Sequence, residues 1–455
     1  MTGVIKINRG FDINLAGKAK KQLGQAPNPE TFALKPADFL GISRPKVLVS
    51  EGDSVKAGTP LLLDRTAENI MYSAPVSGEV VEIRRGDKRK LLEIVILADK
   101  QIEYEQFGKY TMSELVKISR DQALDQLLRS GVWPNIIQRP FGLVANPEDS
   151  PKSIFISTFD THPLAPDYDF LFEGEGHYFE AGINILRKLS TSPIHLGLNG
   201  GGEVSKVFSQ VENVSIHKFS GPHPAGNVGT HIHFIDPINR GDVVWTVHPF
   251  GVIQIGKLFL EGVYDSSRRI ALVGSQVTDP QYYQTYTGAC IDKLVQEKVK
   301  EGENRYISGN VLTGTNVGLN GFLGFYDYMI SVIPEGKHHQ MLGWLSIDPN
   351  KLSFHRAFGL ISFLNPKKKE YVVDTNTKGE HRPFVVSGVF EQVTPLEILP
   401  TQLLKSIQAE DYDEMEALGI YEVLEEDLAL CEFVDPSKHE IQAILREGLD
   451  LMRQG

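Results

Sequence analysis

The sequence predicts an α/β protein of several domains, and three features indicate this fold class. Residues 42–98 read as short apolar strands separated by turns that contain Gly, Asp and Ser. Strand and helix patterns alternate between residues 153 and 199, and from about Pro395 the chain becomes helical. A chain of 455 residues is also long enough for several domains with separate cores.

The N-terminal part, residues 1–100, is predicted to form a flattened barrel. In VLVSEGDSVKAGTPLLLD, EGD and KAG are turns between apolar strands, and MYSAPVSGEVVEI repeats this design around a Ser-Gly-Glu turn. The pattern resembles the barrel-sandwich fold of lipoyl and biotinyl carrier domains. A carrier needs a lysine at the tip of its central hairpin, whereas the candidate tip, DRTAENI (64–70), has none. We therefore expect a carrier-like barrel that is not modified.

Residues 101–255 are predicted to form an α/β layer with a partly parallel, Rossmann-like sheet. Ser119 and Gln122 fit a capping box at the start of a helix, and Gly131 is its stop signal. SIFIS (153–157) and IHLGLNGG (194–201) are strand patterns, with an apolar helical stripe between them. The alternation favours a sheet covered by helices.

The remaining residues are predicted to form an SLBB-like β-grasp module at 256–335 and a C-terminal region at 336–455 that ends in a helical bundle without an iron–sulfur cluster. RRIALVGSQV and YISGNVLTGT read as strands around a short helix at 291–295, and apolar residues at helical spacing mark 403–407 and 441–449. Between these helices, Glu410–Asp427 holds nine carboxylates and no Lys or Arg. We interpret it as a solvated acidic face, and cation binding or partner docking remain alternatives.

Composition excludes several classes of function. The net charge of −12 argues against nucleic-acid binding. Two cysteines, Cys290 and Cys431, cannot hold a four-thiolate iron–sulfur cluster or a zinc ribbon. No apolar run approaches the ~18 residues of a transmembrane helix, and the N-terminus lacks a signal-peptide core. We expect a soluble, cytoplasmic protein, which leaves docking on a membrane partner open.

Motifs for bound redox cofactors are incomplete. Gly174-Glu175-Gly176 lacks the third glycine of a dinucleotide loop, and no clear long helix follows Gly200-Gly201-Gly202. Thr287-Gly288-Ala289-Cys290 has a cysteine where a covalent flavin-attachment string has its acceptor threonine. We interpret the two glycine motifs as turns, and predict no redox cofactor site on this chain.

The stretch SGPHPAGNVGTHIHFIDP (220–237) contains three histidines. If it continues as a strand, His231 and His233 lie on one face, and with His223 or His248 they could form a zinc-like triad. The alternative is a rigid Gly- and Pro-rich loop followed by a strand, in which the histidines hydrogen-bond loop carbonyls. We favour the loop and predict no metal site, because no carboxylate is evident to orient the histidines.

Long strings throughout the chain resemble one protein family. They include IKINRGFDINLAG, SAPVSGEVVEIRRGDKR, QRPFGLVANPEDSPKSIFIS, FDTHPLAPD and KFSGPHPAGNVGTHIHFIDPIN. These strings are similar to the A subunit of the sodium-translocating NADH:quinone oxidoreductase, and the resemblance covers nearly the whole chain. The family is related in architecture to the flavin-bearing subunit of respiratory complex I and to the C subunit of the Rnf complex.

The resemblance implies a peripheral subunit without a flavin or an iron–sulfur cluster of its own. Gln138–Phe141 (QRPF) stands where the flavin-binding relatives have a glycine-rich loop, and only Cys431 stands where they hold a cluster. FMN, FAD, riboflavin, 2Fe-2S and NADH are then expected on other subunits. The membrane-bound B subunit and the C subunit are the expected partners, at the cytoplasmic face of the bacterial inner membrane.

The role expected of this subunit within that complex is structural, together with quinone binding in a cleft that FMN has vacated. The residues that we expect to contact the quinone are Arg139, Phe141, His162 and His223. Two alternatives remain open. One is a non-catalytic scaffold that docks the membrane subunits, and the other is an Rnf-type or complex I-type electron-transfer flavoprotein, which would be yellow.

Overall fold

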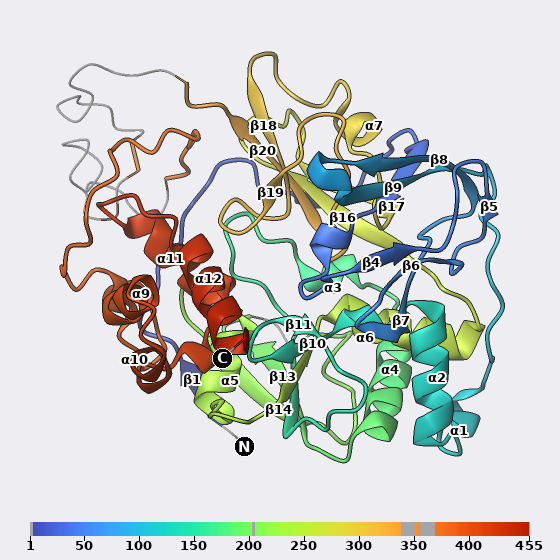
Figure 1. Cartoon of the computed structure of the whole chain (residues 1–455). Coiled ribbons are helices and arrows are strands. Elements are labelled where there is room, and N and C mark those ends of the chain that lie inside the picture. Colours follow the sequence, from blue (N-terminus) through green and yellow to red (C-terminus); the bar gives the residue numbers. More distant parts are fainter. Residues whose placement is uncertain (1–2, 203–204, 338–350, 353, 355–368, 455) are drawn as a thin grey trace.

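The computed structural model describes residues 3–202, 205–337, 351–352, 354 and 369–454. The described chain forms four sheets and two groups of helices (Figure 1). Short 3₁₀ turns at η1 (Pro36–Asp38), η2 (Asp87–Arg89), η3 (Trp133–Asn135) and η5 (Ile420–Glu422) connect some of these elements.

The largest sheet has seven strands, five of them parallel, as the alternating sequence pattern predicts. Its strands, in spatial order, are β1 (Val4–Lys6), β14 (Ser215–Ser220), β13 (Ile194–Asn199), β12 (Ser153–Ser157), β15 (Val244–Val247), β10 (Ile136–Arg139) and β11 (Leu143–Val144). The first five run parallel, and β10 and β11 continue the sheet antiparallel. In β12, Ile154, Phe155 and Ile156 are all buried, because helices cover both faces of a parallel sheet.

One face of this sheet carries a layer of closely packed helices. The layer consists of α1 (Met112–Leu115), α2 (Arg120–Ser130), α4 (Gly176–Leu189) and α6 (Pro249–Glu261). The capping box predicted at Ser119 and Gln122 is confirmed, and Gly131 ends α2 in the left-handed conformation. The opposite face carries α5 (Val228–Ile235), whose Ile232 packs against Phe155 of β12.

Two small sheets form the predicted N-terminal barrel. One contains β3 (Thr31–Leu34), β9 (Leu91–Ala98), β8 (Gly78–Arg85) and β5 (Ser54–Val55), and the other contains β4 (Pro45–Val47), β6 (Pro60–Asp64) and β7 (Ala67–Ser73). The β6–β7 hairpin turns at Arg65 and Thr66, so its tip carries no lysine. Asp64 fixes this turn by accepting hydrogen bonds from the backbone N–H groups of Ser43, Arg44 and Thr66.

The fourth sheet has six strands and includes a strand from the N-terminus. Its order is β19 (Thr315–Asn316), β18 (Asn304–Ser308), β20 (Met329–Pro334), β16 (Ser267–Val273), β17 (Gln281–Tyr286) and β2 (Lys20–Leu23). The short helix α7 (Asp292–Val295) lies between β17 and β18 in the chain. Because β1 joins the seven-stranded sheet and β2 joins the six-stranded sheet, residues 4–23 tie these two parts together.

The C-terminal residues form a compact group of helices beside α5 (Figure 1). They are α8 (Phe390–Val393), α9 (Pro400–Gln408), α10 (Tyr412–Ala417), α11 (Glu425–Val434) and α12 (Ile441–Gln454). Their shared core includes Leu403, Leu428, Cys431, Leu445 and Leu449, all buried. This confirms the helical spacing predicted for α9 and α12.

Candidate functional site

The carboxyl ends of the parallel strands meet two cavities. Parallel sheets commonly bind ligands at this edge, because the loops that leave the strands diverge there. Beyond Ser157 of β12 the chain continues as FDTHPLAPD (159–167) and then α3 (Tyr168–Leu171). Five residues between Phe159 and Tyr168 line both cavities, so this segment is the wall between them.

Cavity A, the first of the two, has a volume of about 790 Å³ and opens to solvent. Its wall is formed by residues 158–169, by Leu198–Gly200 at the end of β13 and by Asp12–Leu15. The rim is polar, since Asp12, Lys18 and Lys218 are exposed.

Cavity B, with a volume of about 700 Å³, lies where the α/β sheet, the six-stranded sheet and the C-terminal helices meet. Its polar side includes Arg139, Asp160, His162, Asn227 and Glu426. Its aromatic side includes Tyr168, His248, Tyr326 and Tyr328. The ring of His248 stacks on that of Tyr328 with centroids 4.0 Å apart, and its Nε2 lies 2.8 Å from the Tyr168 hydroxyl.

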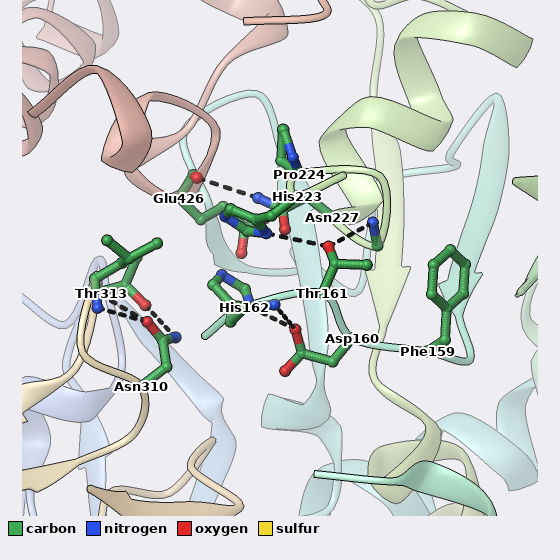
Figure 2. A network of polar contacts seen from close by, with 12 residues as sticks. Phe159, Asp160, Thr161, His162, His223, Pro224, Asn227, Asn310, Thr313 and Glu426 are labelled. Atoms are coloured by element: carbon green, nitrogen blue, oxygen red, sulfur yellow. Dashed lines mark hydrogen bonds and ion pairs between the residues drawn. The ribbon is translucent and has the colours of Figure 1, made fainter. Parts of the chain in front are cut away.

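Asp160 and His162 form a tight pair on the shared wall (Figure 2). His162 Nδ1 lies 2.6 Å from Asp160 Oδ1, which also accepts the backbone N–H of His162 at 2.8 Å. Burial lowers the pKa of His162, but Asp160, together with Glu426 and Asp427, outweighs burial and raises the pKa above its ordinary value of 6.5. Burial alone would raise the pKa of Asp160, yet His162 lowers it to about 2.

His223 lies directly against this pair but lines neither cavity. Its ring centroid is 4.5 Å from that of His162, and its Nδ1 is 3.1 Å from Thr161 Oγ1. Burial, followed by the neighbouring charge of His162, keeps the pKa of His223 well below its ordinary value. His223 is therefore neutral where His162 is charged.

The loop that carries His223 is held by the N-terminal segment. The His223 backbone N–H donates to Asp12 Oδ1 at 2.9 Å, and the Phe11 N–H donates to the His223 carbonyl at 2.9 Å. Gly10 passes so close that an added Cβ would stand 2.1 Å from the His223 oxygen. The strings INRGFDIN and SGPHPAG thus lie side by side.

Arg139 is buried and doubly ion-paired. Its Nη1 donates to Asp427 Oδ2 at 2.9 Å and its Nη2 to Glu426 Oε1 at 2.5 Å, while Nε has no hydrogen-bond partner among the described residues. Burial raises the pKa of Glu426, although Arg139 opposes this effect. The positive charge of Arg139 is therefore largely neutralised by Glu426 and Asp427.

Phe141 lines neither cavity. It adopts a positive φ of 82°, its ring contacts Tyr421 edge-on at 6.1 Å, and its carbonyl accepts from Arg446 at 2.9 Å. Of the four residues expected to bind quinone, the structure thus places Arg139 and His162 on the wall of cavity B, whereas Phe141 and His223 line neither cavity.

The strand predicted after the His223 loop is wrong, because residues 228–235 form helix α5. His231 and His233 consequently point to different sides. His231 Nε2 is 2.9 Å from the Ala225 carbonyl and its ring stacks on Phe219, whereas His233 Nδ1 is 2.7 Å from Glu422 Oε2. Among the described residues, no group of three or more His, Cys, Asp or Glu side chains could hold a metal ion.

The interpretation of residues 410–427 as a solvated acidic face fits residues 410–414, whose acidic residues are exposed, but is wrong for residues 422–427. Glu426 and Asp427 pair with Arg139, Glu425 pairs with Arg446, and Glu422 contacts His233. The acidic segment therefore holds the C-terminal helices against the α/β domain.

Sequence reasoning missed three polar groups of the cavity wall: Asp160, Asn227 and Glu426. Asp160 lies within FDTHPLAPD at a strand end, where a carboxylate two residues before a histidine is a usable signal. Glu426 has no such signal, because 287 residues separate it from Arg139.

Three family models match the chain. They are described as "NqrA N-terminal barrel-sandwich hybrid domain" (residues 5–99), "NqrA second alpha/beta domain" (118–264) and "NQRA C-terminal domain" (269–318, of the SLBB type). The predicted barrel-sandwich and SLBB-like parts are thereby confirmed.

Curated relatives match over the whole length. The A subunit of the Na(+)-translocating NADH-quinone reductase of Serratia proteamaculans is 39% identical, and the match covers 99% of this chain and 100% of the relative. The corresponding subunit of Alcanivorax borkumensis is 38% identical, with 98% of both chains covered. The chain also matches a solved structure of an NAD+-reducing [NiFe]-hydrogenase at 13% identity, over 78% of this chain and 68% of the hydrogenase chain. The TM-score of this match is 0.37, which is too low to support an inference.

No helix within the described residues is long and apolar enough to cross a membrane. An identity of 38–39% over nearly the full length of both chains is enough to establish membership of a protein family. The chain belongs to the NqrA family, the A subunits of the Na(+)-translocating NADH-quinone reductase.

Proposed function

We propose that this chain is a peripheral subunit of a Na+-translocating NADH:quinone reductase and that cavity B binds the head group of the quinone. The full-length similarity to the NqrA relatives supports its place in such a complex, which transfers electrons from NADH to quinone and exports sodium. The chain then lies at the cytoplasmic face of the membrane, through contacts with other subunits such as the B and C subunits.

One observation carries the quinone proposal. Arg139 Nε, His162 Nε2 and Asn227 Oδ1 are buried without hydrogen-bond partners among the described residues, and all three side chains line cavity B. Buried polar atoms without partners are rare in folded proteins, and a functional role of the site is one explanation for them. An arginine N–H and a protonated histidine N–H suit a carbonyl oxygen, which only accepts hydrogen bonds.

The remaining wall suits a flat, apolar ring. A volume of about 700 Å³ falls within the range of small-molecule sites. The stacked pair His248 and Tyr328, with Tyr326, offers aromatic surface, and Met329 and Val247 add apolar contacts. Such a wall matches a quinone ring with the first part of its tail.

Electrons for quinone reduction come from other subunits in this proposal. The sequence has no complete flavin or iron–sulfur motif, so FMN, FAD, riboflavin and the 2Fe-2S cluster are assigned to partners. A purified chain with visible flavin absorbance or bound iron would contradict this assignment and favour an Rnf-type or complex I-type subunit.

Titration of the purified chain with a short-chain quinone tests the binding proposal. Trp133 and Trp245 are buried beside cavity-lining Asn135 and Thr246, so bound quinone should quench their fluorescence saturably. Calorimetry provides an independent readout. His162→Gln should weaken binding ~2–10-fold, the equivalent of one hydrogen bond.

The matched control is His439→Gln. His439 is also buried and pairs with Asp435 at 2.7 Å, but it lines neither cavity. Its replacement should leave quinone affinity unchanged. Absence of saturable quinone binding by the wild-type chain would remove the proposal and leave the docking scaffold as the function.

A further inference from the structure

The Asp160–His162 pair lies between cavity A, which opens to solvent, and cavity B, the proposed quinone site. Asp160, His162 and Tyr168 line both cavity A and cavity B. A two-electron reduction of a quinone also consumes two protons, one for each oxygen. The site that holds the quinone therefore needs a group placed to hand protons to its oxygens.

The hydrogen bonding of His162 leaves one ring nitrogen available for this task. Nδ1 is engaged by Asp160 Oδ1 at 2.6 Å, whereas Nε2 is buried and has no partner among the described residues. Because a carboxylate only accepts, Nδ1 carries a hydrogen, and the exchangeable proton belongs to Nε2. The side chains of His162 and Asp160 are 12% and 15% exposed, and both residues line the two cavities.

The charges around His162 favour its protonated form. Asp160, Glu426 and Asp427 act on it with negative charge, and together they outweigh burial. Arg139 compensates two of these carboxylates, and His223, at 4.5 Å, is neutral. The remaining titratable groups of the cavity B wall are Asp38, Tyr168, His248, Glu425, Tyr326, Asp327 and Tyr328.

We propose that His162 donates a proton from Nε2 to a quinone oxygen in cavity B and that Asp160 is its positioning residue. This inference rests on the proposed function. The Nε2–H bond breaks and an O–H bond forms on the quinone, while the electrons come from a reduced flavin or iron–sulfur centre of a partner subunit. His162 is left neutral, with its remaining hydrogen on Nδ1 toward Asp160, and water from cavity A restores the proton.

The first test needs no quinone. In the full chain labelled with ¹⁵N-histidine, the His162 resonances should show the Nδ1–H tautomer when neutral and a pKa above 6.5. Asp160→Asn removes the negative charge but keeps an oxygen that can accept from Nδ1. It should lower this pKa by about one unit or more. An unchanged pKa in Asp160→Asn would overturn the inference.

The second test uses the assembled complex. The acid form of His162 is the donor, so quinone reduction should fall as the pH rises through its pKa, and Asp160→Asn should move this fall to lower pH by about one unit. His162→Gln should slow reduction ~100-fold or more, while quinone affinity changes less than ~10-fold. Asp435→Asn, which alters the remote pair with His439, should leave the pH profile in place.

The outcomes separate the two proposals. If wild-type chain binds quinone but His162→Gln retains the full rate, or Asp160→Asn retains the wild-type pH profile, the proton-donor inference falls and the binding proposal stands. If the wild-type chain binds no quinone, the binding proposal falls and takes the inference with it.

Discussion

Removing Arg139 should destabilise the protein strongly, because its partner Asp427 would remain buried as an uncompensated charge. The side chain of Arg139 is 2% exposed and that of Asp427 is not exposed at all. Without Arg139, Asp427 Oδ2 would keep one hydrogen bond among the described residues, which it accepts from the Leu424 N–H at 3.0 Å. Breaking a buried pair of this kind costs ~3–5 kcal/mol. We expect Arg139→Met to lower the free energy of unfolding by that amount.

A double-mutant cycle isolates the ion pair. Asp427→Asn keeps an oxygen to accept the Leu424 N–H but removes the charge. The double variant Arg139→Met/Asp427→Asn no longer holds the fully buried Asp427 charge, and only the part-exposed Glu426 has then lost Arg139. Its loss should therefore be ~2 kcal/mol smaller than the sum of the single losses. Urea unfolding at pH 7, followed by circular dichroism, measures all four proteins.

Arg240→Met is the matched control. Arg240 also joins the α/β domain to a C-terminal helix, through Glu416 at 3.1 Å, but its side chain is 76% exposed. Exposed ion pairs contribute at most ~1 kcal/mol. The reasoning is refuted if Arg139→Met costs no more than Arg240→Met, or if the Arg139 and Asp427 losses are additive.

Two further predictions concern stability. Burial lowers the pKa of His231 to about 4 and that of His248 to about 3, so both are neutral in the folded protein and take up protons on unfolding below pH ~6.5. Each should reduce the unfolding free energy by about 1 kcal/mol per pH unit between pH 6 and 4, and a flat urea midpoint over this range would contradict the linkage. Gly182→Ala should destabilise by at least ~1–3 kcal/mol, since the added Cβ would stand 1.9 Å from the Val252 carbonyl of the helix packed against it. Gly201→Ala is the control, because its added Cβ would meet nothing closer than 3.5 Å, and it should be tolerated. Thermal unfolding of both variants measures the two effects, and an equal loss of stability in both would contradict the packing argument.

Local patterns predicted individual elements well where one physical signal dominated. The buried run SIFIS became β12, and the capping box with its glycine stop became α2. Helix α5 was missed because the alternation in THIHFI imitates a strand. Val228, Ile232 and Ile235 lie at helical spacing in the same stretch, and all three belong to the cluster around Phe155. The spacing of the apolar residues was the better guide there than the spacing of the histidines.

The site was harder to predict, because its walls come from distant parts of the chain. Arg139 and His162 could be singled out from the family resemblance, and both line cavity B. The environment of these residues could not be predicted, since Asp427 and Glu426 are more than 280 residues away from Arg139 in the sequence. The acidic segment looked solvated because its cationic partners, Arg139 and Arg446, lie outside it. No short-range pattern encodes such pairings.

The position of bound quinone is the most direct test of the proposed site. A photoreactive quinone can be cross-linked to the assembled complex and its attachment site mapped by mass spectrometry, with excess short-chain quinone as the competitor. Quinone binding in cavity B predicts competed label on the peptides that line it, which are residues 37–40, 135–142, 157–168, 226–228, 246–248, 309–329 and 424–442. Competed label confined to other parts of this chain, or to other subunits, would contradict it.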